Sequence, residues 1–86
     1  MKSLIISFKS RNELYFFAKY LRENFIYSSI INSPKGVASS CTLSIKTDFQ
    51  NLEKVKKSLN KHSFKSFNGL FLMQQSSFGN QILKIS

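Results

Sequence analysis

The chain has 86 residues, of which 42% are hydrophobic and 14% aromatic, a composition that suits one small folded domain and excludes a disordered chain. No apolar run approaches the roughly 20 residues of a membrane span and no segment resembles a secretory signal, so we expect a soluble protein. A single cysteine, Cys41, cannot form an intramolecular disulfide, which favours a reducing, cytoplasmic setting.

Positive charge dominates the chain. Thirteen Lys and Arg residues against four Asp and Glu residues give a formal net charge of +9, which can attract nucleic acid, anionic lipid or an acidic protein. Only Arg11 and Arg22 are arginines, and the lysines are dispersed from Lys2 to Lys84. A solvated, lysine-rich surface is therefore the simplest interpretation of the charge.

The first third of the chain predicts a strand, a helix and a second strand. The short apolar segment 4–8 is typical of a buried central strand. Ser10 and Glu13 have the spacing of a capping box, which predicts a helix that starts there and ends at Asn24. Extended character over 27–31 predicts the second strand. The residues of the helix expected to face the sheet are Leu14, Phe17, Ala18, Leu21 and Phe25.

The rest of the chain predicts two more strands and a second helix. Alternation over 41–46 predicts a strand with one face covered, on which Cys41 would lie beside Leu43 and Ile45. Asp48 is a suitable cap for a helix that ends near 60–62. Its inner face is expected to hold Phe49, Leu52, Val55 or Lys56, and Leu59.

The fourth strand is expected over 70–73, with 64–67 leading into it and Asn68-Gly69 marking a hairpin or a bulge. The resulting order predicts an α+β, ferredoxin-like sandwich, in which an antiparallel four-stranded sheet carries two helices on one face and leaves the other face open. Residues 1–73 form this single domain. Residues 74–86 form a C-terminal tail whose apolar part, 82–85, either docks as an added edge strand or stays loose.

Three short segments carry a resemblance to a known family. They are Phe8-Lys9-Ser10 after the first strand, Ile30-Ile31-Asn32-Ser33-Pro34 at the second, and Ser39-Ser40-Cys41 opening the third. In their order and spacing, roughly over residues 2–73, they resemble a small bacterial family of putative selenium/sulfur carrier-like proteins.

The family places a Cys-Gly pair after a Pro-basic-x-x-Ser segment. The matching residues in this chain are Pro34, Lys35, Ser39 or Ser40, and Cys41. Thr42 stands in place of the family's glycine, which removes backbone freedom that would let a substrate approach the sulfur closely.

The resemblance implies that the Cys41 thiolate takes up sulfur or selenium from a donor protein, as a persulfide or selenosulfide, and passes it to an acceptor protein. Such chemistry needs an accessible thiolate whose pKa is lowered from about 8.5 by a nearby cation or by backbone amides. The candidate binding residues around it are Lys35, Gly36, Ser39 and Ser40. A buried, inert Cys41 is the alternative, because free cysteine is among the most often buried residue types.

No other catalytic group stands out, so we expect a carrier or binding protein that needs no cofactor, and whether it is also an enzyme stays open. Glu13 and Asp48 are assigned to helix caps, and the remaining acidic residues to exposed faces. His62 is the only histidine, and with one cysteine it cannot complete the usual zinc ligand set. We expect it to be a solvated residue at the helix end.

Two further functions stay open. A sheet of this topology can present aromatic side chains to nucleic-acid bases, although the expected strand 41–46 contains no aromatic residue. The chain is otherwise an interaction domain, in which the open sheet face or the segment 82–85 pairs with a second copy to form a homodimer.

Overall fold

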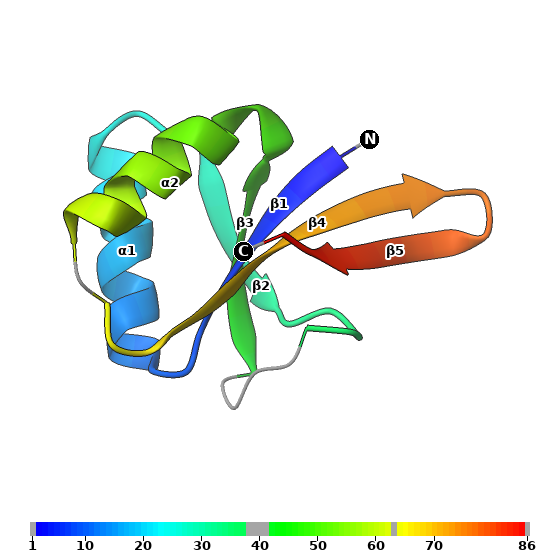
Figure 1. Ribbon diagram of the computed structural model, residues 1–86, viewed down its shortest axis with the longest axis horizontal. Coiled ribbons are helices and arrows are strands. Elements are labelled where there is room, and N and C mark those ends of the chain that lie inside the picture. Colours follow the sequence, from blue (N-terminus) through cyan, green and yellow to red (C-terminus); the bar gives the residue numbers. More distant parts are fainter. Residues whose placement is uncertain (1, 38–41, 63, 86) are drawn as a thin grey trace.

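The computed structural model describes residues 2–37, 42–62 and 64–85, which form one antiparallel sheet and two α-helices (Figure 1). Their bounds are β1 (Lys2–Phe8), α1 (Arg11–Glu23), β2 (Ser28–Asn32), β3 (Leu43–Asp48), the short 3-10 helix η1 (Phe49–Asn51), α2 (Leu52–Lys61), β4 (Phe67–Ser76) and β5 (Gly79–Lys84). The strands lie in the order β2-β3-β1-β4-β5, and every neighbouring pair is antiparallel. The predicted α+β class is therefore confirmed.

The sheet has five strands instead of the predicted four, because the tail forms the added edge strand that was one of its two predicted states. β4 continues past Met73 to Ser76, and a tight turn pairs Ser76 with Gly79 at the start of β5. Gly79 has a φ of 116°, a left-handed conformation that glycine adopts without strain. The polar residues after Met73 obscured this hairpin because both of its strands are exposed near the turn.

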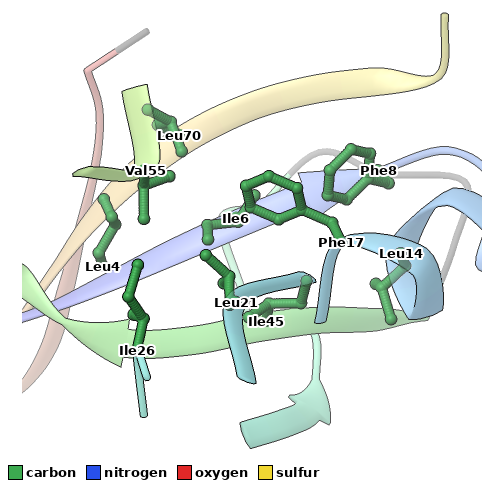
Figure 2. Packing of buried hydrophobic residues seen from close by; sticks show 10 residues of the cluster. All are labelled: Leu4, Ile6, Phe8, Leu14, Phe17, Leu21, Ile26, Ile45, Val55 and Leu70. Atoms are coloured by element: carbon green, nitrogen blue, oxygen red, sulfur yellow. The ribbon is translucent and has the colours of Figure 1, made fainter. Parts of the chain in front are cut away.

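One layer of apolar side chains joins both helices to the same face of the sheet. Figure 2 shows Phe17 and Leu21 of α1 beside Ile6 of β1. Buried apolar side chains stabilise a fold by roughly 1.5–3 kcal/mol each, so this layer is the main source of stability. Its buried members are Leu4, Ile6, Phe8, Leu14, Phe17, Leu21, Ile26, Ile45, Val55 and Leu70.

The second helix follows its predicted pattern. The Asp48 carboxylate accepts a hydrogen bond from the Gln50 amide at 2.9 Å, so it caps η1, which leads directly into α2. Val55 is buried and Lys56 is exposed, which settles the alternative that the pattern left open. The expected irregularity near Asn68 is a bulge, because the register between β1 and β4 shifts there.

Glu13 does not form the predicted capping box. The Ser10 carbonyl accepts the Leu14 amide at 3.1 Å, but no side-chain cap bond forms at this end of α1. The Glu13 carboxylate instead accepts hydrogen bonds from the Ser66 hydroxyl and from the Ser66 amide, the latter at 2.7 Å. It therefore ties α1 to the segment that leads into β4. These bonds and the nearby Lys65 lower the pKa of Glu13, although its partial burial opposes them.

We predict that Glu13→Gln destabilises the protein by about 1 kcal/mol near neutral pH, because a neutral amide accepts more weakly than a carboxylate. Since the pKa is lower in the folded state, the stabilisation is complete above the unfolded pKa and is lost as the pH falls through the folded one. Urea unfolding of wild type and variant across pH measures both the loss of stability and its pH dependence. The two proteins should converge once the pH falls below the folded pKa of Glu13, and a constant difference would contradict the assignment.

An aromatic residue occupies the left-handed position that ends α1. The Phe25 amide donates to the Arg22 carbonyl at 3.1 Å and the Ile26 amide to the Leu21 carbonyl at 2.9 Å, the two bonds of a Schellman motif. Phe25 has a φ of 61° and is 98% exposed. Its predicted place on the inner face is therefore wrong, because the chain reverses at Asn24 and Ile26 enters the core in its place.

We predict that Phe25→Gly stabilises the protein by about 1 kcal/mol, because glycine adopts positive φ without the Cβ clash. Phe25→Ala is the matched control: it removes the same exposed ring but keeps the Cβ. Urea unfolding should place the alanine variant near wild type and the glycine variant above both. Equal stabilities would show that the backbone is not strained there.

Candidate functional site

The candidate site is the connection from β2 to β3, because it carries the only cysteine. Cys41, Ser39 and Ser40 lie outside the described residues, and so does the expected start of a strand at Cys41. β3 is described from Leu43, and its alternation places Ile45 in the core. That Cys41 continues this alternation remains a prediction.

The base of this connection is held by hydrogen bonds. The Ser33 amide donates to the Thr42 carbonyl at 2.7 Å, which extends the pairing of β2 with β3 by one step. The hydroxyls of Ser33 and Ser44 are 2.7 Å apart, and Ser44 is fully buried. Cys41 thus directly precedes a residue whose backbone is anchored to the sheet.

The first part of the connection is a β-turn over 34–37. The Val37 amide donates to the Pro34 carbonyl at 3.2 Å, and Gly36 at the third position has a φ of 97°. Lys35, at the second position, is exposed. That Gly36 is also a binding residue, as the sequence suggests, stays a prediction.

Gly36 lies against the opposite edge strand. A Cβ placed on Gly36 would be 3.3 Å from the Cβ of Ile82, in β5. Because β3, β1 and β4 separate β2 from β5, the turn must reach across the sheet face that the helices leave free. The expected open face is therefore partly covered.

The residues on this second face agree with that placement. Ile5 is fully buried and Phe71 is 4% exposed, although both point away from the helices. The register lines up Lys46, Ile5, Phe71 and Lys84 across four strands, so two lysines flank an apolar centre. The sequence alone does not reveal this arrangement of lysines, because period-two alternation assigns a face only after the register is known.

His62 is not the solvated residue that was expected. Its amide donates to the Ser58 carbonyl at 3.2 Å, as a helix end requires. Its ring lies among three aromatic rings, with centroid distances of 4.7 Å to Tyr20 and 5.9 Å to both Phe16 and Phe64. Within the described part of the chain, its buried Nε2 has no hydrogen-bond partner.

The residues that the structure describes contain neither a cluster of metal ligands nor a helix that could span a membrane. Over 2–37, 42–62 and 64–85, no three His, Cys, Asp or Glu side chains gather as metal ligands. Neither α1 nor α2, the α-helices of that part, is long and apolar enough to span a lipid bilayer.

We predict that Gly36→Ala destabilises the protein by about 2 kcal/mol, because it adds backbone strain and a close contact with Ile82. Gly79→Ala is the matched control, since Gly79 also has positive φ but no atom within 4 Å of the added Cβ. The Gly79→Ala variant should lose about 1 kcal/mol of folding stability. Urea unfolding, with Ile82→Ala as the second arm of a double-mutant cycle, separates the two effects. Equal losses at both glycines would refute the contact.

Comparison with known proteins finds one relationship. Searches of curated proteins and of solved structures find no match. A family model described as "Putative Se/S carrier protein-like" matches residues 3–67. The match covers well over half of the chain, from β1 to the first residue of β4, and includes the whole connection from β2 to β3. It confirms the resemblance found in the sequence, and the chain belongs to this Se/S carrier protein-like family.

Proposed function

We propose that this protein carries sulfur or selenium on the Cys41 thiol, receiving it from a donor protein and delivering it to an acceptor protein. The observation that carries the proposal is the family match over residues 3–67, which contains Cys41 and the segments of the sequence resemblance. The strand order β2-β3-β1-β4, with two helices on one face, supports a ferredoxin-like topology to which β5 is added.

The transfer needs no external oxidant. The Cys41 thiolate attacks the terminal sulfur of a donor persulfide, the sulfur–sulfur bond of the donor breaks, and the donor leaves as a thiolate. The product is a persulfide on Cys41, and the same exchange with selenium gives a selenosulfide. An acceptor nucleophile then takes the terminal atom and returns Cys41 to a thiolate. A reducing, cytoplasmic setting would keep the resting thiol free for this cycle.

The described parts of the connection support this chemistry in two ways. The hydrogen bond from the Ser33 amide to the Thr42 carbonyl anchors the chain next to Cys41, which limits the conformational freedom of the attachment point. The exposed Lys35, in the turn formed by Gly36, adds a cation to the same connection. A cation near a thiol lowers its pKa and raises the thiolate fraction at neutral pH.

Ser39 and Ser40 complete the proposed site, because their backbone amides and hydroxyls precede the sulfur directly. Residues 1–73 would form the carrier domain, and β5, from the tail 74–86, would support the turn through Ile82. Thr42 replaces the family's glycine. Its carbonyl still accepts the hydrogen bond from the Ser33 amide, so the substitution is compatible with the anchoring of the connection to β2.

We predict that the native protein reacts with iodoacetamide near neutral pH and retains one added sulfur atom after exposure to a small persulfide donor. Cys41→Ser should abolish both. Lys35→Gln should raise the pKa of the Cys41 thiol, which lowers the thiolate fraction and slows alkylation roughly threefold near neutral pH. Mass spectrometry and the pH dependence of the alkylation rate give the two readouts.

Two controls make this test specific. Lys35→Arg keeps the charge and should react like wild type, and Lys57→Gln removes one exposed charge from α2 and should also leave the rate unchanged. A thiol that reacts only after unfolding would refute the carrier. An unreactive thiol together with salt-dependent binding of oligonucleotides would assign the basic surface to nucleic acid instead.

A further inference from the structure

An apolar groove runs between α1 and the edge strand β2, on the side of the sheet that the helices cover. It has a volume of about 670 Å³. Tyr15 and Ala18 of α1 form one wall and Ile30 of β2 contributes to the other, while Phe25 and Tyr27 stand where the chain passes from α1 to β2. The carrier chemistry proposed above uses none of these residues.

The outer edge of β2 offers unpaired backbone groups along this groove. Among the described strands, β2 pairs only with β3, and the Ser33 amide donates a hydrogen bond to the Thr42 carbonyl across that pair. Hydrogen bonding alternates along an antiparallel strand, so the amides and carbonyls of Ile30 and Asn32 point away from β3. In the part of the chain that the structure describes, no strand pairs with that edge. Such an edge is a template for an added strand.

The aromatic residues at one end of the groove are exposed to an unusual degree. Phe25 is 98% exposed and Tyr27 is 86% exposed. Phe25 is also held at a positive φ, which is unfavourable for a bulky side chain. It contributes no burial to the fold, so a role in binding explains why an aromatic ring stands at a position that suits glycine.

The positive charge of the groove favours an acidic partner over a second copy of the chain. Lys19 and Arg22 line it, and none of its lining residues is acidic. A second copy of the chain would bring the same two cations, and a further net charge of +9, against this surface. An acidic chain would instead pair its carboxylates with these cations.

We propose that β2 and this groove bind an acidic, extended segment of a partner protein, which adds as a sixth strand beside β2. Its backbone pairs with Ile30 and Asn32, an apolar side chain enters the groove against Ile30, and carboxylates meet Lys19 and Arg22. β2 ends where the connection to β3 begins, so a partner docked along it is directed towards that connection. The docking itself is independent of sulfur transfer.

The test uses the full chain and a fluorescein-labelled peptide in which Glu alternates with Ile and Phe, with binding followed by fluorescence anisotropy. Asn32→Pro removes one outward-pointing amide, keeps the bonds to β3 and should weaken binding about tenfold. Asn32→Ala, which keeps the amide, should bind like wild type. Phe25→Gly should weaken binding severalfold although the fold becomes more stable, a combination that a structural role for Phe25 would not produce.

Charge variants test the orientation of the partner. Arg22→Glu should weaken binding about tenfold, while Lys57→Glu, an equal change of net charge on α2, should change it less than about twofold. A peptide with Lys in place of Glu should regain affinity only for Arg22→Glu. Cys41→Ser should bind normally, so failure of sulfur transfer and failure of docking are separate results.

Three outcomes would overturn the proposal. In the first, Asn32→Pro binds the peptide as tightly as wild type. In the second, Arg22→Glu and Lys57→Glu weaken binding equally and an oligonucleotide competes, which would indicate a nonspecific cationic surface. In the third, sedimentation shows a dimer that Asn32→Pro dissociates, which would make a second copy the occupant of the edge.

Discussion

The burial of β1 on both faces is the constraint on which the rest of the structure depends. Leu4, Ile6 and Phe8 face the helices, while Ile5 faces the opposite side and is equally inaccessible to solvent. A central strand that is apolar on both sides needs a layer on each face. The two helices supply one layer. The turn after β2, seated on Ile82, contributes to the other.

This second layer connects fold stability to the candidate chemistry. The described part of the connection that carries Cys41 packs on Ile82, on the face to which Ile5 and Phe71 also point, so its path is set by apolar packing as well as by the hydrogen bonds at its base. Gly36 allows the close approach, because a Cβ there would press on Ile82. The contact gives this glycine a structural reason that is independent of its predicted role in binding.

The two ends of β2 have different roles in the proposals. Its C-terminal end leads into the connection with the thiol, and its N-terminal end follows the strained, exposed Phe25. The backbone edge between them is unpaired in the part of the chain that the structure describes, and it lies beside Lys19 and Arg22. A partner bound along this edge would run towards the connection that carries the thiol, because β2 leads directly into it.

Local sequence patterns alone determined the strands and α-helices from β1 to β4, the burial of Leu14, Phe17 and Leu21, the cap at Asp48 and the family, because periodicity, capping and motif spacing are properties of neighbouring residues. Tertiary structure decided the partner of Glu13, the exposure of Phe25, the aromatic surroundings of His62 and the packing of Gly36 on Ile82. Each of these depends on segments that are distant in the chain or on the direction in which the chain leaves a helix. The strand register decides which distant segments meet, and the reversal after α1 decides where the chain goes next. A local sequence pattern encodes neither of these.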